Sequence, residues 1–87
     1  MNVSDILNKL GAIVNGGDEA GEIAKEAVTI TNQYKAGQLS QSEYQELIGD
    51  LQTEKLILIG ANQLALKEEL DQLFSNIQSA ISILPML

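Results

Sequence analysis

The spacing of apolar residues predicts two amphipathic helices in the first third of the chain. Apolar side chains recur every three or four positions over residues 4–14, and Ser4 is placed to cap that helix. A glycine pair ends it, and Asp18 is placed to cap a second helix over residues 18–36. Small residues line one face of the second helix, with Gly21 beside them. We therefore expect a neighbouring helix to approach closely.

The segment that follows carries the signals of a tight turn between two helices. Gly37 can adopt the left-handed backbone conformation that ends a helix, because glycine has no Cβ atom to clash. Ser40 and Glu43 fit a capping box, in which each side chain accepts a hydrogen bond from the other residue's amide. Leu39 and Tyr44 occupy the two positions of a hydrophobic staple. These five residues predict an antiparallel helical hairpin.

The remaining half of the chain predicts one long helix from residue 41 to residue 82. Two apolar stripes run along it, out of register by about one residue: Tyr44, Leu47, Ile48, Leu51 and Leu58, then Leu66, Leu70, Leu73, Ile77, Ala80 and Leu84. Residues 56–66 are apolar nearly all the way round, so more than one neighbour must cover them. Such a helix would be roughly 60 Å long at 1.5 Å per residue.

Two arrangements would cover so long an apolar surface. Either the helix breaks near Gly60 and folds back as a monomeric four-helix bundle, or it stays continuous and is buried between subunits. We expect the continuous helix, with at most a bend at Gly60, because the residues there lack the turn signals found around Gly37.

A continuous helix would place its apolar residues between copies of the chain, so a homo-oligomer is expected. The residues predicted to form this oligomer or partner interface are Leu56, Ile57, Leu58, Ile59, Leu64, Leu66, Leu70, Leu73, Phe74, Ile77, Ile81, Leu84, Met86 and Leu87. The last two follow Pro85, which ends the helix. They either fold back on their own subunit or dock into a neighbouring protein.

A stripe of acidic residues lies at the start of the second predicted helix. Asp18, Glu22 and Glu26 are spaced four residues apart, and Glu19 lies beside them. Such a stripe is typical of a solvated helix face, and the alternative is a contact for a basic partner protein.

Composition and charge exclude several classes of function. Five lysines against twelve acidic residues give the chain of 87 residues a net charge of −7, which repels nucleic acid and anionic membranes. The chain has no cysteine or histidine and therefore lacks the commonest catalytic base and metal ligands. Capping explains Ser40 and Ser42 better than nucleophilic catalysis does. We therefore expect no enzyme activity, catalytic residue, metal or cofactor.

The turn residues Gly37, Leu39, Ser40, Glu43 and Tyr44 follow an order that resembles the helical hairpin of short carboxyl-terminal domains known as SHOCT. This resemblance covers about a fifth of the chain and implies a helical hairpin. In those domains the hairpin usually closes the protein, whereas some forty residues follow it here. In general style the short, acidic, all-helical chain also resembles small proteins of tailed bacteriophages, which implies a virion component, an assembly factor or a host-directed inhibitor.

The sequence thus predicts a single all-α domain over residues 1–87, as a helical bundle or a coiled-coil-like oligomer. A second interpretation assigns two short strands to the β-branched segments 28–31 and 55–60. The expected function is that of a self-associating structural or protein-interaction module, and the alternative is an acidic inhibitor or adaptor that binds a basic surface. No targeting signal or membrane-spanning stretch is evident, so a cytoplasmic or virion-associated location is expected.

Overall fold

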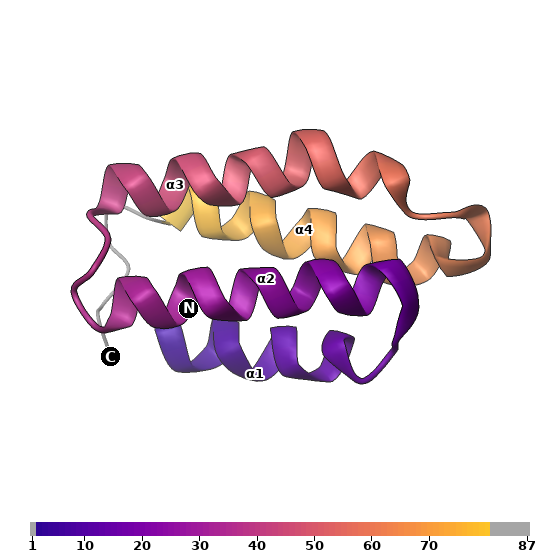
Figure 1. The fold of residues 1–87 in the computed structure, drawn as a ribbon, viewed down its shortest axis with the longest axis horizontal. Coiled ribbons are helices and arrows are strands. Elements are labelled where there is room, and N and C mark those ends of the chain that lie inside the picture. Colours follow the sequence, from indigo (N-terminus) through magenta and orange to yellow (C-terminus); the bar gives the residue numbers. More distant parts are fainter. Residues whose placement is uncertain (1, 81–87) are drawn as a thin grey trace.

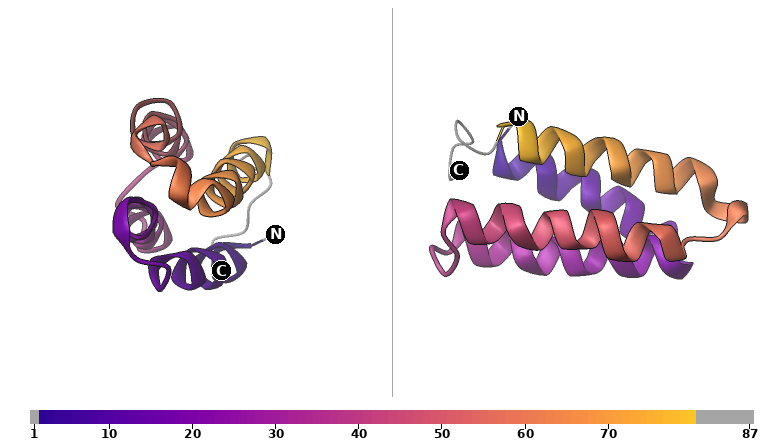
Figure 2. Two further views of the ribbon diagram at one scale, coloured as in Figure 1. Left: turned by 90° about the vertical axis from the view of Figure 1, so that its right-hand side faces the viewer. Right: turned by 90° about the horizontal axis from the view of Figure 1, so that it is seen from above.

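The computed structural model describes residues 2–80, which form an all-α bundle of four helices (Figure 1). The helices are α1 (Val3–Val14), α2 (Asp18–Lys35), α3 (Gln41–Asp50) and α4 (Leu64–Ala80). Each helix runs antiparallel to the one before it, and seen end-on they stand at four corners around a shared interior (Figure 2). No strand occurs within residues 2–80, so the two-strand interpretation is wrong.

The predicted continuous helix over residues 41–82 is also wrong. The longest dimension of the structure is 35 Å, and the chain reverses between α3 and α4. Ile59 leaves the helical conformation, with a φ of −74° and a ψ of 127°, and Gly60 follows it. The chain thereby takes the arrangement that breaks near Gly60 and folds back. The predicted positions Ile81, Leu84, Met86 and Leu87 lie outside the described residues.

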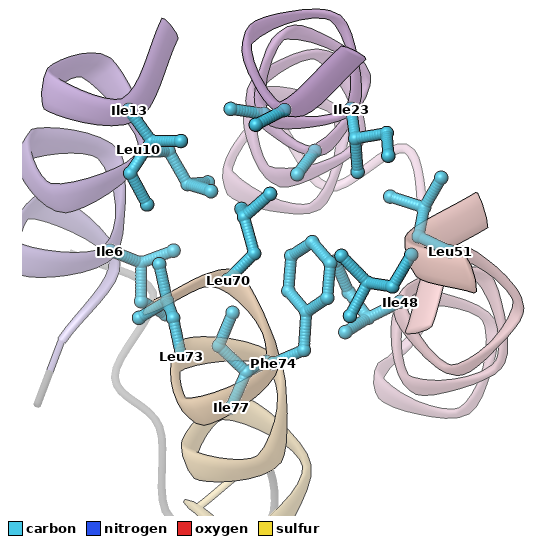
Figure 3. Close-up of a cluster of buried hydrophobic side chains, with 14 of the residues drawn as sticks. Ile6, Leu10, Ile13, Ile23, Ile48, Leu51, Leu70, Leu73, Phe74 and Ile77 are labelled. Atoms are coloured by element: carbon cyan, nitrogen blue, oxygen red, sulfur yellow. The ribbon is translucent and has the colours of Figure 1, made fainter. Parts of the chain in front are cut away.

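The fold-back lets α4 complete the hydrophobic core of its own chain. Phe74 and Ile77 are fully buried among aliphatic side chains from α1, α2 and α3. Figure 3 shows Ile6, Leu10, Ile13, Ile23, Ile48 and Leu51 pointing into the same space as Leu70, Leu73, Phe74 and Ile77. Burial of this apolar surface is the main term that stabilises the bundle.

Helices α1 and α2 make the closest pair in the bundle. A Cβ atom on Gly21 would lie 2.9 Å from the carbonyl oxygen of Val14, so the small face of α2 does admit a near neighbour, as predicted. The cap of α1 differs from the prediction. Asn2, rather than Ser4, accepts the amide hydrogen bond of Asp5 at 2.9 Å and completes a capping box with it.

The turn between α2 and α3 confirms the predicted capping. Gly37 has a φ of +80°, and its amide and that of Gln38 bond back to the carbonyls of Tyr34 and Gln33, which closes α2. The Ser40 hydroxyl accepts the Glu43 amide at 3.1 Å, and the Glu43 carboxylate accepts the Ser40 amide at 2.9 Å. Leu39 is half-buried and Tyr44 fully buried, both against the core.

Two stacked tyrosines and a buried hydroxyl pair join α2 to α3 near this turn. The rings of Tyr34 and Tyr44 lie 4.5 Å apart between centroids and 7° from parallel. The Tyr44 hydroxyl is 2.8 Å from the hydroxyl of Thr31, which is also buried. Burial raises the pKa of Tyr44 above the ordinary value for tyrosine. The hydrogen bond with Thr31 opposes this rise, and the nearby Tyr34 adds to it.

Candidate functional site

The connection between α3 and α4, residues 51–63, is here called the crossover. It begins with a π-helical turn, η1 (Leu51–Lys55), in which the amide of Leu56 bonds to the carbonyl of Leu51, five residues earlier. A 3₁₀ turn, η2 (Leu56–Leu58), follows, and the amide of Ile59 bonds to the carbonyl of Leu56 at 3.1 Å. A second 3₁₀ turn, η3 (Ala61–Gln63), leads into α4.

The change of helix type decides which crossover side chains enter the core. In a regular α-helix Leu58 would follow Leu51 two turns later on the same face. The π turn uses one more residue than an α turn, and the 3₁₀ turn uses fewer. As a result Leu56 and Ile59 are buried beneath the crossover, and Leu58 is displaced to the surface. The predicted membership of Leu58 in the first apolar stripe is therefore wrong.

Three large hydrophobic side chains lie exposed at this end of the bundle. They are Ile57, which is 69% exposed, Leu58, which is 64% exposed, and Leu64, which is 54% exposed. We refer to these three residues as the crossover patch. Other large apolar side chains of the described residues are at least partly covered, so these three, all in the crossover or next to it, are the large apolar side chains left mainly in water. Ile57 and Leu64 line one shallow hollow, and Leu58 lines another.

The predicted oligomer interface is therefore divided by the fold. Leu56, Ile59, Leu70, Leu73, Phe74 and Ile77 are buried within the chain's own bundle, which corrects their assignment to a contact between chains. Leu66 is half-buried and packs against the core. Ile57, Leu58 and Leu64 remain accessible to another protein. Because α3 and α4 fold against each other, each helix covers the stripe of its neighbour.

A buried glutamine holds the crossover against the start of α2. The Gln63 side-chain oxygen accepts the Ala20 amide at 3.1 Å, and its nitrogen donates to the Gly17 carbonyl at 3.4 Å and to the Asp18 carboxylate at 3.3 Å. Gly17 occupies the N-cap position and has no side chain that could accept these amides. The prediction that Asp18 caps α2 is therefore wrong, because Gln63 does so from more than forty residues away.

Sequence reasoning missed Gln63, although a signal was present. Asn62 and Gln63 are the polar residues in the otherwise apolar segment from Leu56 to Leu66. Their position there marks a break in an apolar run, and a buried side-chain amide usually has a bonding task. The partner of Gln63 could not be inferred, because the contact depends on the fold-back of the chain.

An open groove of about 580 Å³ lies between α2 and the crossover. Its lining residues are Asp18, Glu19, Glu22, Ile23, Glu26, Lys55 and Leu58, and we call it the acidic groove. The structure thus brings all four residues of the predicted acidic face to one groove and adds a member of the crossover patch to its wall. Its four carboxylates face a single lysine, which leaves the groove with a formal charge of −3.

The carboxylates of the acidic groove differ in how firmly they are held. Asp18, whose φ of +52° lies in the left-handed region, accepts a bond from Gln63, and Glu19 accepts the Gly60 amide at 3.5 Å. Glu22 and Glu26 are exposed and form no ion pair or hydrogen bond within residues 2–80. Their charges are therefore available to an approaching cation.

Two further features bear on the class of site. Within the described part of the chain, no group of three or more acidic side chains is placed to hold a metal ion. Among the same residues, no helix combines the length and apolar character needed to cross a membrane.

Comparisons with known proteins identify no family for this chain. No family model matches it, and no curated protein or solved structure is significantly similar to it. The resemblance of the α2–α3 turn to SHOCT domains therefore stays a prediction.

Proposed function

We propose that this protein is a non-enzymatic interaction module that holds another protein against the crossover end of its bundle. The observation that carries the proposal is the exposure of Ile57, Leu58 and Leu64 at the crossover end of the bundle, while the other large apolar side chains of residues 2–80 are at least partly covered. Large apolar side chains left in water at one end of an acidic protein are typical of a protein contact.

The patch is not required to complete the fold, and this supports a role in binding. The four helices already bury a shared core, and Leu56 and Ile59 anchor the crossover from within. Ile57 and Leu58 project away from that core because of the π and 3₁₀ turns. Leaving them in water gains the folded monomer nothing, whereas a partner that covers them would gain apolar contact.

The charges beside the patch favour a basic partner. The acidic groove shares Leu58 with the crossover patch, and its carboxylates line the opposite wall. A partner with basic groups next to apolar ones would match both features. This geometry supports an adaptor or inhibitor of a basic protein over a coiled-coil assembly, whose predicted contact residues are largely buried.

Self-association is the second candidate, and the same crossover patch supports it. Two copies could pair their patches symmetrically and serve as a structural or assembly unit. Such a pair would bring two acidic grooves together in a protein of net charge −7, and this repulsion disfavours it. Light scattering at micromolar concentration separates the two candidates. We expect a monomer, and a dimer that is lost on Leu58→Ser would establish self-association instead.

Affinity capture from the native source tests the proposed function. The bait would be the full chain, compared with a triple variant Ile57→Ser, Leu58→Ser, Leu64→Ser. A matched control carries Gln38→Ser and Gln45→Ser, two exposed positions near the α2–α3 turn at the opposite end of the bundle. We expect a protein that is retained by the wild type and the control and lost by the triple variant. Equal retention by all three would overturn the proposal.

A further inference from the structure

We infer that the occupant of the acidic groove is an amphipathic α-helix of another protein, with lysine or arginine on one face and a large apolar side chain beside them. This inference rests on the proposed function and specifies the partner's chemistry. It combines three features of the groove: an apolar wall, a periodic row of carboxylates, and a lining that is fixed before any partner arrives.

The apolar wall consists of Leu58 from the crossover and Ile23 from α2. Leu58 is 64% exposed and supplies most of this apolar surface, and Ile23, which is buried, also lines the groove. A partner's leucine or aromatic side chain inserted here would remove Leu58 from water. Polar groups alone would leave that surface uncovered, which argues against a purely hydrophilic occupant.

The row of carboxylates sets the spacing of the partner's charges. Asp18, Glu22 and Glu26 lie at four-residue intervals on α2, which places successive members roughly 6 Å apart along the helix axis. A second helix has the same repeat, so basic residues at four-residue intervals would meet all three in turn. An amphipathic helix also presents its apolar residues beside such a row, as the wall formed by Leu58 requires.

The groove is held in shape by bonds that do not involve its occupant. Gln63 ties the crossover to Gly17, Asp18 and Ala20, and the Gly60 amide bonds to Glu19. These contacts fix the wall of Leu58 relative to the start of α2. Because the groove is already ordered, binding a partner costs less conformational entropy in its side chains and backbone.

A second copy of this chain cannot supply the required occupant. Its five lysines are Lys9, Lys25, Lys35, Lys55 and Lys67, and no two are fewer than ten residues apart. No helix of the chain therefore presents basic residues at four-residue intervals. Nucleic acid and anionic membrane surfaces would be repelled by the same carboxylates.

Fluorescence anisotropy with two synthetic peptides tests the inference on the full-length protein. Both peptides have one composition of lysine, leucine and alanine. The patterned peptide has lysines at four-residue intervals with leucines on the adjoining face, and the scrambled peptide distributes the lysines around the helix. We expect the patterned peptide to bind about tenfold more tightly, and its affinity to fall as ionic strength rises towards about 0.15 M.

Substitutions in the acidic groove and on α3 test whether the patterned peptide binds in the groove. Glu22→Gln with Glu26→Gln, and separately Leu58→Ser, should each weaken the patterned peptide about tenfold. The matched control, Glu46→Gln with Asp50→Asn, makes the same charge change at the same spacing on exposed positions of α3, outside the acidic groove. We expect this control to bind like the wild type. All five substituted side chains are exposed, so the fold should persist.

Three outcomes would overturn the inference: equal binding of the two peptides, equal weakening by the control, or no effect of Leu58→Ser. Failure here is distinguishable from failure of the proposed function. If capture from the native source still depends on the crossover patch while neither peptide shows groove-dependent binding, the interaction module stands and the basic helix is wrong. If patch-dependent capture is also absent, both fail.

Discussion

The amide of Leu56 donates a hydrogen bond to the carbonyl oxygen of Leu51, five residues earlier, and this bond closes the π turn that begins the crossover. The π turn uses one more residue than an α turn, so the buried position that follows Leu51 falls on Leu56, and Lys55 is exposed. Ile59 follows in the core one 3₁₀ turn later, and Leu58 is left on the wall of the acidic groove. A local change of helix type thus links the core to the candidate contact surface.

Truncating Leu56 should cost far more stability than truncating Leu58. Leu56→Ala removes a buried side chain, and we expect the free energy of unfolding to fall by about 2–5 kcal/mol. Leu58→Ala removes an exposed one and should change it by less than about 0.5 kcal/mol. Urea denaturation followed by circular dichroism measures both. The reverse order would indicate that the crossover continues as a regular α-helix.

Removing the side-chain amide of Gln63 should destabilise the bundle from a distance. Gln63→Ala deletes the acceptor of the Ala20 amide and two further bonds, so we expect a loss of about 1–2 kcal/mol in the free energy of unfolding. Gln45→Ala, at an exposed position of α3, is the control and should be nearly neutral. Chemical denaturation of both variants provides the measurement. Equal effects would show that Gln63 is not the cap of α2.

Two glycine-to-alanine substitutions should separate close packing from helix propensity. Gly21→Ala would place its Cβ atom 2.9 Å from the Val14 carbonyl oxygen, and we expect it to destabilise the protein by about 1–3 kcal/mol. Gly11→Ala meets no atom within 4 Å in α1 and should stabilise the protein by about 0.5–1 kcal/mol. Thermal unfolding would show one midpoint lowered and the other raised. Two shifts in the same direction would contradict the close α1–α2 contact.

The stability of the bundle should fall in alkaline solution because of Tyr44. Burial raises the pKa of Tyr44 above the ordinary value for tyrosine, so the unfolded chain loses this proton at a lower pH than the folded chain does. Above about pH 10 the folded state then binds more protons than the unfolded state, and the free energy of unfolding falls as pH rises. Below that pH the contribution is fully present.

The variant Tyr44→Phe isolates this contribution. It should be less stable than the wild type near neutral pH by about 1 kcal/mol, since the hydrogen bond with Thr31 is lost. Its decline between pH 9 and 11 should be shallower, because lysine titration continues but the buried phenol is absent. Denaturant midpoints measured across that range test the difference. Parallel declines would mean that Tyr44 does not contribute to the alkaline loss.

The sequence alone determined the features that depend on neighbouring residues. Gly37, Ser40 and Glu43 end one helix and start the next through bonds that span only a few positions, so their pattern predicted the turn correctly. Helical periodicity likewise predicted an all-α fold, and the small face of α2 predicted a close neighbour.

Only the tertiary structure decided where the long apolar half of the chain would be buried. A continuous helix between subunits and a reversal within one subunit both cover the stripe that contains Leu70 and Ile77, so periodicity cannot choose between them. The choice depends on contacts between residues distant in sequence, such as the bond from Ala20 to Gln63. The same contacts bring Glu22 and Leu58 to one groove, because the carboxylate and the apolar side chain meet only after the chain has folded back.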